Sequence, residues 1–437
     1  MQDPARLATG QMAWPAAYRV VAFVEARHRA LALALAAAVV GLGAIYSFYL
    51  GDSLPYLDEQ ENFRLATNIA VHRAYTVYGT EPEVHRAPGY PLLLSVPIAL
   101  GAGIPHLRLL NFVALALSLY FTYALVRDHA SPVGGVAAAL LVLCYPVLSY
   151  TAGTLFPQTI ASFLLVLALF VIVGAKSLRT YLLGGVLFGL LLLTVPAFLL
   201  PLVMVTAWVW LRRGRRGFVL ALAVLLPALL IAGLWSARNY AEFGSFVFIR
   251  SGLGFQLFVG NFELAAPTAG ANLDVSTYVL ETTGLNQVEQ DAYFLSKALE
   301  WIGQNKGEAA RLYGLKLLNY FNFRNELHAA AESSVLADIV MLITYWPLLA
   351  FGIARVALAR RFPLSRLELL LIALYLSDAV VSAFMITRIR YRLPFDWLLI
   401  ALVAMFLARV AARRRQGLVE GKGVLFQQSN SPAARGW

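Results

Sequence analysis

Three carboxylates lie within four residues of one another in the stretch LDEQENF, residues 57–63. Only 14% of the 437 residues are charged, so this concentration of acid is unusual for the chain. A carboxylate held close to a hydroxyl can take its proton as a general base, and Asp58 is our candidate for that role. The alternative is structural: Asp58, followed three residues later by Glu61, fits a capping box at the start of a helix.

A second group that could do chemistry lies near the other end of the chain, in TRIRYR, residues 387–392. In an extended segment, residues 388, 390 and 392 point to one side, and their guanidinium groups would form a cluster suited to phosphate oxygens. Arg86 adds a cation next to an interrupted apolar segment. For the arginines of 388–392 the alternative is a snorkelling set that contacts lipid head groups nonspecifically, and for Arg86 it is an interfacial anchor.

The elements that must position these residues are apolar. Hydrophobic residues make up 60% of the chain and the mean hydropathy is +0.69, which indicates an integral membrane protein. The single cysteine, Cys144, excludes a disulfide framework within one chain. No zinc-protease motif and no glycine-rich phosphate loop is present. The net charge of +11 reflects basic clusters at the ends of apolar runs, so we expect no nucleic acid partner.

The apolar runs predict a membrane topology. They cover residues 30–50, 88–104, 107–126, 132–150, 157–175, 180–195, 197–211, 217–236, 335–358, 366–386 and 391–409. If every run crossed, the basic cluster at 212–216 would lie outside, against the positive-inside bias. Run 88–104 is short and contains prolines and glycines, so we expect it to be interfacial or re-entrant. About ten spanning helices then remain in an all-α polytopic membrane protein.

This topology divides the chain into five parts. They are a cytoplasmic amphipathic N-terminus at 1–29, a core transmembrane module at 30–236, an extracytoplasmic segment at 237–334, C-terminal transmembrane helices at 335–412 and a cytoplasmic disordered tail at 413–437. The core module contains a first extracytoplasmic loop, residues 51–106, with a short amphipathic surface helix from Glu59 onward. Asp58 and the arginines of 388–392 then face outward, where three arginines break the positive-inside bias.

Four stretches, taken together and in this order, resemble a known family. They are LDEQENFRLATNIA (57–70), HRAPGYPLLL (85–94), RNYAEFGSFVFIRSGLGFQLFVGN (238–261) and RIRYRLPFDWLL (388–399). They resemble the family 39-like branch of the glycosyltransferase C superfamily, which includes protein O-mannosyltransferases and the lipid A aminoarabinose transferase. The resemblance implies a core of seven membrane helices and surface helices in the first outer loop. It also implies a polyprenyl-phosphate-linked sugar donor and inversion at the anomeric carbon.

The resemblance also implies roles for individual residues. Asp58 falls on the family's catalytic aspartate, Glu59 on the acidic residue that commonly follows it, and Arg86 where relatives place a basic residue near the donor phosphate. Gln158 is a departure, because many relatives carry an acidic residue at that helix end. We therefore expect a single base, Asp58.

The combined hypothesis is that an acceptor hydroxyl, deprotonated by Asp58, attacks the sugar while the lipid phosphate leaves. The residues expected to bind substrate are Glu59, His85, Arg86, Arg388, Arg390, Tyr391 and Arg392. Because arginines can hold the phosphate, no cofactor and no metal is required, although Asp58 with Glu59 could hold a divalent ion weakly.

The expected partners are the lipid-linked donor, a glycan, lipid or protein acceptor, and membrane lipids. The expected location is the cytoplasmic (inner) membrane of a bacterium, with the site on the periplasmic side. Two rival hypotheses remain open. A flippase or transporter for lipid-linked sugars predicts charges buried near mid-membrane, and a noncatalytic scaffold predicts that Asp58 can be replaced without loss.

Overall fold

The computed structural model describes residues 16–79, 81–268, 273–324 and 335–429, with side chains described from 19 to 413 within these ranges. Every regular element in them is helical, which confirms the all-α prediction. The elements are α1 (Ala16–Leu50), α2 (Leu57–His72), α3 (Gly89–Ala99), α4 (Ile104–His129), α5 (Pro132–Leu143), α6 (Pro146–Ala152), α7 (Gln158–Val173), α8 (Leu178–Thr194), η2 (Pro196–Phe198), α9 (Leu199–Arg213), α10 (Arg215–Phe243), α11 (Leu253–Gly260), α12 (Ser276–Glu281), α13 (Gln287–Gln304), α14 (Lys306–Tyr320), α15 (Val335–Ala357), α16 (Arg366–Phe384) and α17 (Ile389–Ser429).

Six of the described helices are long and apolar enough to cross a membrane: α1, α4, α10, α15, α16 and α17. The pair α5 and α6 passes the same test together but is bent by 62°. The helices α7 and α8 are apolar and shorter, and α9 has 15 residues. Each of the ten predicted spans thus forms a helix or a bent pair, and the chain is a multi-pass membrane protein. The predicted count of ten crossings is approximate.

The interrupted run at 88–104 forms α3, a helix of only 11 residues. At about 1.5 Å per residue this helix is roughly 16 Å long, about half the hydrocarbon thickness of a bilayer. Its first residue, Gly89, packs against the end of α8. A Cβ atom at this position would lie 2.7 Å from the backbone nitrogen of Thr194, so only glycine fits. The length agrees with the expectation that this run does not cross.

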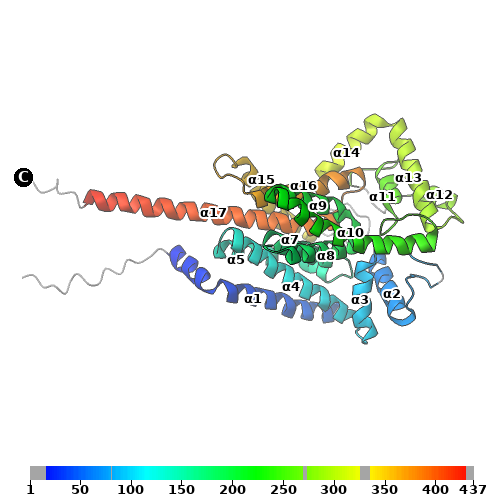
Figure 1. Ribbon diagram of the computed structural model, residues 1–437, viewed down its shortest axis with the longest axis horizontal. Coiled ribbons are helices and arrows are strands. Elements are labelled where there is room, and N and C mark those ends of the chain that lie inside the picture. Colours follow the sequence, from blue (N-terminus) through cyan, green and yellow to red (C-terminus); the bar gives the residue numbers. More distant parts are fainter. Residues whose placement is uncertain (1–15, 80, 269–272, 325–334, 430–437) are drawn as a thin grey trace, which may run out of the picture.

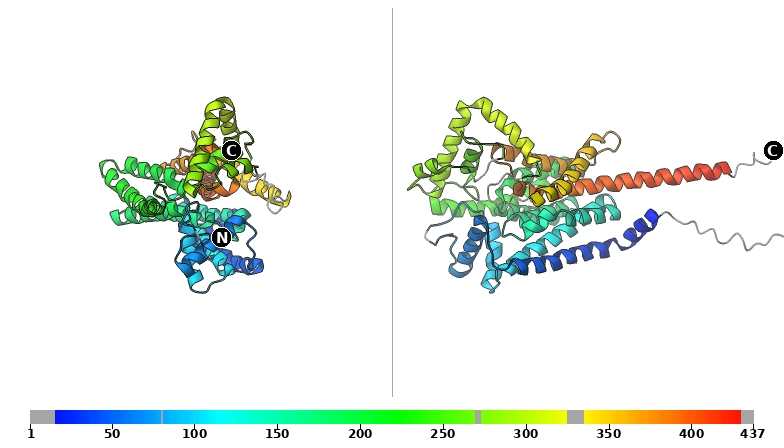
Figure 2. Two further views of the ribbon diagram at one scale, coloured as in Figure 1. Left: turned by 90° about the vertical axis from the view of Figure 1, so that its right-hand side faces the viewer. Right: turned by 180° about the vertical axis from the view of Figure 1, so that it is seen from behind.

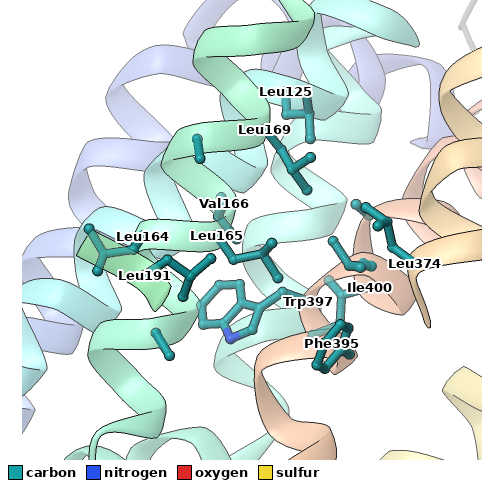
Figure 3. Packing of buried hydrophobic residues seen from close by; sticks show 14 of the residues in the cluster. Leu125, Leu164, Leu165, Val166, Leu169, Leu191, Leu374, Phe395, Trp397 and Ile400 are labelled. Atoms are coloured by element: carbon teal, nitrogen blue, oxygen red, sulfur yellow. The ribbon is translucent and has the colours of Figure 1, made fainter. Parts of the chain in front are cut away.

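Leucine, valine and aromatic side chains from α4, α7, α8, α16 and α17 fill the centre of the bundle (Figure 3). Trp397 of α17 lies among them, 1% exposed. Glycines allow the backbones to approach closely: a Cβ atom on Gly185 of α8 would lie 2.4 Å from the carbonyl oxygen of Val224 in α10. Such small-residue contacts are the usual means of packing helices in membranes.

The long helices run between two ends of the bundle that differ in the elements they carry (Figures 1 and 2). The beginning of α1 and the end of α17 lie together at one end, which we call the terminal end. The helices α2, α3, α11, α12 and α13 lie at the opposite end, which we call the Asp58 end. The predicted surface helices of the first loop and the segment after α10 therefore share one end.

One predicted boundary needs correction. The helix α17 continues to Ser429, so residues 413–429 of the predicted disordered tail are helical. The reason is that residues such as Leu418, Glu420 and Lys422 are good helix formers and extend a helix that the preceding span has already nucleated. Residues 430–437, and residues 1–15 of the predicted N-terminal part, lie outside the described residues.

Candidate active site

The first turn of α2 presents Asp58 without using it as a cap. Tyr56 is the residue before the helix, and its backbone N–H donates to Glu59 Oε2 at 3.3 Å. The capping box predicted for Asp58 and Glu61 is therefore wrong, because the helix starts at Leu57 and the capping carboxylate is that of Glu59. The side chain of Asp58 is left for other partners.

Glu59 instead fixes α2 to the connection between α6 and α7. Its Oε1 accepts the backbone N–H of Leu155 at 2.9 Å, and Asn62, one turn later, donates to the carbonyl of Leu155 at 2.9 Å. Glu59 is 1% exposed and both of its oxygens accept backbone N–H groups. This geometry gives no support to the prediction that Glu59 binds substrate, and it makes the residue an anchor for α2.

Asp58 lies between two arginines that come from distant parts of the chain. Arg86 Nη2 donates to Asp58 Oδ1 at 2.8 Å, and Arg390 Nη1 donates to Asp58 Oδ2 at 2.6 Å. Arg86 also pairs with Glu61. The side chains of Asp58, Arg86 and Arg390 are 27%, 25% and 32% exposed, so solvent and ligands can reach them. We call Asp58, Glu61, Arg86 and Arg390 the Asp58 cluster.

The two arginines set the charge of Asp58. Burial alone would raise the pKa of its carboxyl group, but the charges and hydrogen bonds of Arg390 and Arg86 outweigh burial and lower the pKa to about 2. Asp58 is therefore ionised at neutral pH. Removing or neutralising either guanidinium group would make it a stronger base.

A tight turn holds Arg86 in place. Glu83 Oε1 accepts the backbone N–H groups of His85 at 2.5 Å and of Arg86 at 3.1 Å. The hydroxyl of Tyr75 donates to the carbonyl oxygen of Arg86 at 2.8 Å. The turn is thus fixed by a buried carboxylate and a phenol, and its arginine side chain points to Asp58.

Arg390 is the second residue of α17, and its side chain lies near two aromatic rings. Its guanidinium carbon is 5.6 Å from the ring centre of Phe156 and 5.2 Å from that of Tyr391. Nη2 also donates to the Tyr391 hydroxyl at 3.4 Å, whereas Nε is buried and has no partner among the described residues. Tyr391 therefore contacts Arg390 beside the Asp58 cluster, and its predicted role in substrate binding stays a prediction.

Arg392 does not belong to this cluster, contrary to the prediction. Its side chain is 1% exposed, pairs with Asp396 at 3.1 Å and donates to the carbonyl oxygens of Tyr320 and Asn322. The prediction assumed an extended segment, but α17 begins at Ile389. In a helix two residues are about 200° apart, so Arg390 and Arg392 face opposite sides. Arg388 lies just before the helix, and its charge acts on the Tyr391 hydroxyl.

Arg250 is a site residue that the sequence did not single out. Its half-buried guanidinium group interacts electrostatically with Tyr391, Asp58 and Asp291, and with Arg86 in the repulsive sense. Burial lowers the pKa of Arg250, which nevertheless stays charged at neutral pH. No side chain or carbonyl among the described residues is hydrogen-bonded to this guanidinium group. Arg250 is thus a cation without a fixed partner beside the Asp58 cluster.

A strained turn presents Arg250. Its backbone N–H donates to the Phe248 carbonyl at 2.7 Å across Ile249, which has φ +62°. That φ value is rare for a β-branched residue and belongs to the less stable form of the γ-turn. Two residues later Gly252, at φ +102°, leaves space in which the Arg250 side chain lies. Strain of this kind persists only where surrounding contacts impose it.

His85 supplies part of those contacts. Its Nδ1 is 2.6 Å from the hydroxyl of Ser251, and the Ser251 backbone N–H donates to the carbonyl of Val84 at 2.9 Å. Burial lowers the pKa of His85, so the ring is neutral at pH 7. His85 therefore connects two loops, the one that contains Arg86 and the one that contains Arg250.

Gln158, the departure from the family pattern, starts α7 next to Phe156 but lies outside the Asp58 cluster. It lines a small internal cavity of ≈ 10 Å³ with Thr159 and Trp397, and its Oε1 has no hydrogen-bond partner among the described residues. No carboxylate among the described residues stands in its place at the start of α7. Asp58 stays the candidate base because it contacts both Arg86 and Arg390, whereas Glu61 pairs with Arg86. The arrangement can accept a proton and bind a multiply charged anion at one end of a membrane bundle.

Comparisons with known proteins find similarity among solved structures only. No model of a known protein family matches the chain, and no curated protein matches it. Among solved structures, the oligosaccharyltransferase of Archaeoglobus fulgidus, crystallised with Zn and sulfate, is similar at 16% identity and a TM-score of 0.49. The match covers 90% of this chain and 51% of that one, so the chain spans about half the length of this protein.

Two structures of ArnT from Cupriavidus metallidurans are also similar. The structure bound to undecaprenyl phosphate has 16% identity, a TM-score of 0.40 and coverage of 86% of this chain and 78% of that one. The apo structure has 14% identity, a TM-score of 0.38 and coverage of 85% and 75%. Because all three TM-scores are below 0.5, we base the functional argument on the site itself.

Proposed function

We propose that this protein is an inverting glycosyltransferase that moves a sugar from a polyprenyl-phosphate donor to an acceptor hydroxyl. The observation that carries the proposal is the pairing of one accessible carboxylate, Asp58, with Arg86 and Arg390 at one end of a membrane bundle. Arg250 adds a guanidinium group whose charge acts on the same carboxylate. Such a set provides a base and the cations for a leaving phosphate, which are the parts this transfer needs.

The transfer forms one bond to the anomeric carbon of the sugar and breaks another. Asp58 takes the proton of the acceptor hydroxyl, whose oxygen forms a bond to the anomeric carbon of the sugar. The bond from that carbon to the phosphate oxygen breaks, and its electron pair stays on the phosphate. The lipid phosphate gains negative charge as it leaves, and Arg86, Arg390 and Arg250 stabilise that charge. The attack comes from the face opposite to the phosphate, so the configuration inverts.

The donor itself would tune the base. In the free protein Asp58 is a weak base because Arg86 and Arg390 hold its pKa at about 2. A phosphate that accepts hydrogen bonds from these arginines also offsets their positive charge. The pKa of Asp58 then rises toward its ordinary value, since the charges that lowered it are neutralised. The carboxylate becomes a better proton acceptor only when the donor is bound.

We propose that the site faces the outer side of the cytoplasmic membrane and that the acceptor is a glycan, a lipid or a protein. We also propose that the transfer needs no divalent metal, because guanidinium groups hold the phosphate. A chelator should then leave the rate of transfer unchanged, and complete loss of activity with restoration by a metal would contradict this part.

Transfer of labelled sugar from a panel of polyprenyl-phosphate sugars, by membranes containing the full chain, tests the proposal. Asp58→Asn removes the basicity and keeps the size, and it should lower the rate by about 10²–10⁴-fold, the usual contribution of a general base. Asp52→Asn is the matched control, because Asp52 is an exposed acid in the same loop.

The control should transfer sugar like the wild type. If Asp58→Asn also retains the wild-type rate while wild-type membranes are active, Asp58 is not the base. If no donor in the panel is used by the wild type, the transporter hypothesis becomes the one to test, with uptake of the same lipids into vesicles as the measurement.

A further inference from the structure

The terminal end of the bundle carries a second concentration of arginines, far from Asp58. Residues 353–370 and 405–413 contain six arginines and one acid. The arginines are Arg355, Arg360, Arg361, Arg366, Arg409 and Arg413, and the acid is Glu368. From Arg390 to Arg409 the helix α17 advances 19 residues, or about 29 Å, which is close to the thickness of the hydrocarbon core. The two groups of arginines therefore lie at opposite membrane surfaces.

A buried ion network holds this second group in place. Arg355 and Glu368 are both 0% exposed, and Arg355 Nε pairs with Glu368 Oε1 at 2.7 Å. Arg409 Nη1 pairs with Glu368 Oε2 at 2.8 Å, so one glutamate joins α15, α16 and α17. Arg355 also donates to the carbonyl oxygens of Phe362 and Pro363. The connection between α15 and α16 is thus fixed against α17.

A groove of ≈ 220 Å³ opens on this network. It is lined by Phe362, Pro363, Arg409, Ala412 and Arg413. The guanidinium carbon of Arg413 is 4.2 Å from the ring centre of Phe362, and its Nη1 donates to the carbonyl of Arg361 at 2.8 Å. These contacts hold the side chain over the groove instead of leaving it extended into solvent.

Both arginines of the groove keep donors for a ligand. Arg409 uses Nη1 for Glu368 and the carbonyl of Pro363, and Arg413 uses Nη1 for the carbonyl of Arg361. Within the described part of the chain, Nε and Nη2 of both side chains have no hydrogen-bond partner. Two guanidinium groups that line one groove and have unused donors match the oxygens of a phosphate group.

We propose that this groove, which we call the Arg409–Arg413 groove, binds the phosphate group of an anionic membrane lipid. The one acid of the region is buried and already shared by two arginines, so the surface around the groove is strongly positive. Basic pockets between membrane helices at the interface bind anionic lipid head groups in this way. The groove is independent of the Asp58 cluster and of the proposed transfer.

Native mass spectrometry of the detergent-purified full chain, titrated with phosphatidylglycerol or phosphatidylcholine, tests the proposal. The wild type should retain phosphatidylglycerol in preference. Arg413→Gln should weaken that binding about tenfold, the loss expected for one hydrogen-bonded charge. Ala412→Phe should also weaken it, because it fills the groove and leaves every charge in place. Arg216→Gln removes an exposed arginine outside the groove and should have no effect.

Two results would overturn the proposal. One is equal binding by the wild type and Arg413→Gln. The other is an unchanged affinity of Ala412→Phe together with equal losses in Arg413→Gln and Arg216→Gln, which would mean diffuse attraction. Inorganic phosphate identifies the source of the ligand: if it displaces phosphatidylglycerol from the wild type, the groove also takes free phosphate, and if it does not, the site requires the lipid.

Discussion

Arg390 and Arg392 are two residues apart on α17, and each pairs with an aspartate, yet the two pairs differ in every other respect. Arg390 and Asp58 come from distant segments and are about a third exposed. Arg392 and Asp396 lie one turn apart on the same helix and are each 1% exposed. The ring of Tyr345 lies 3.6 Å from the Arg392 guanidinium carbon, and the hydroxyl of Tyr145 donates to Asp396 at 2.8 Å.

The difference shows which charges a ligand can use. A buried pair cannot release its partners without leaving a charge unpaired in a medium of low dielectric constant. A partly exposed pair is stabilised little by its own contact, so a phosphate can replace the carboxylate as the partner of the arginine. Burial and the origin of the partners therefore separate a structural arginine from one that is available to substrate.

The largest expected effect is on folding and concerns the buried pair. Arg392→Met removes the positive charge that pairs with buried Asp396 and the donor to the carbonyl of Tyr320, so we expect a loss of about 3–5 kcal/mol in the free energy of unfolding. Size-exclusion chromatography of the extracted protein and its thermal midpoint measure this loss. Adding Asp396→Asn should restore part of it, since no buried charge is then uncompensated. If Arg392→Met is instead as stable as the wild type but lacks transfer activity, Arg392 binds the donor phosphate and is not a structural residue.

The exposed pair should behave in the opposite way. Arg390→Gln should lower kcat/KM for the lipid-linked donor about 10²-fold, because a cation that stabilises the leaving phosphate is lost. Its effect on the free energy of unfolding should stay below about 1 kcal/mol, as for other partly exposed ion pairs. Arg390→Lys keeps the charge and should recover part of the activity. Thermal destabilisation as large as that of Arg392→Met would contradict this contrast.

From the sequence, the position of Arg390 near Asp58 was predicted, whereas the position of Arg392 was predicted wrongly. Three arginines on the outer side of the predicted topology drew attention to 388–392, and Arg390 does contact Asp58. The geometry of the segment could not be predicted, because Ile389 to Arg392 has no periodicity that distinguishes a strand from the first turn of a helix. The end of a helix is the least predictable feature of a sequence, and here it decides which side each arginine faces.

Other parts of the fold followed from composition and periodicity. The helices of the ten apolar runs, the shortness of α3 and the common end of the segments at 51–106 and 237–334 could be predicted from helix length, proline and charge alone. Arg250 was not predicted because it is one of several cations in residues 237–334. Its position depends on a positive φ at Ile249, a residue type that gives no signal of such a turn.

Replacing Arg250 should have a smaller effect on transfer than replacing Arg390, and it tests whether a partly exposed arginine without a fixed partner also binds the donor. Arg250→Gln breaks no hydrogen bond to a described residue, so thermal stability should be unchanged. The KM for the donor should rise about tenfold, the loss of one charge-assisted contact to phosphate, with a smaller change in kcat. Lys297→Gln is the matched control, since Lys297 is a cation of the same segment whose ammonium group lies over the ring of Tyr293. Equal effects of the two variants would mean that general charge, and not position, matters.

The smallest expected effect concerns His85, which joins the loops of Arg86 and Arg250. Burial lowers the pKa of His85 below that of the unfolded chain, while Glu83 and Asp291 oppose this shift and Arg250 and Arg86 reinforce it. As the pH falls through 6.5, the unfolded chain takes the proton before the folded chain does, so stability is lost. The thermal midpoint should therefore fall less between about pH 7.5 and 5.5 in His85→Gln than in the wild type.

The exposed His72 is the matched control for this measurement, and His72→Gln should keep the wild-type dependence on pH. A structural role for His85 alone would lower the thermal midpoint of His85→Gln equally at both pH values. Titration of the ring changes the difference between the two pH values, because protonation places a positive charge on a buried ring near Arg86 and Arg250. If His85→Gln loses as much stability on acidification as the wild type, another group controls how the two loops are held together.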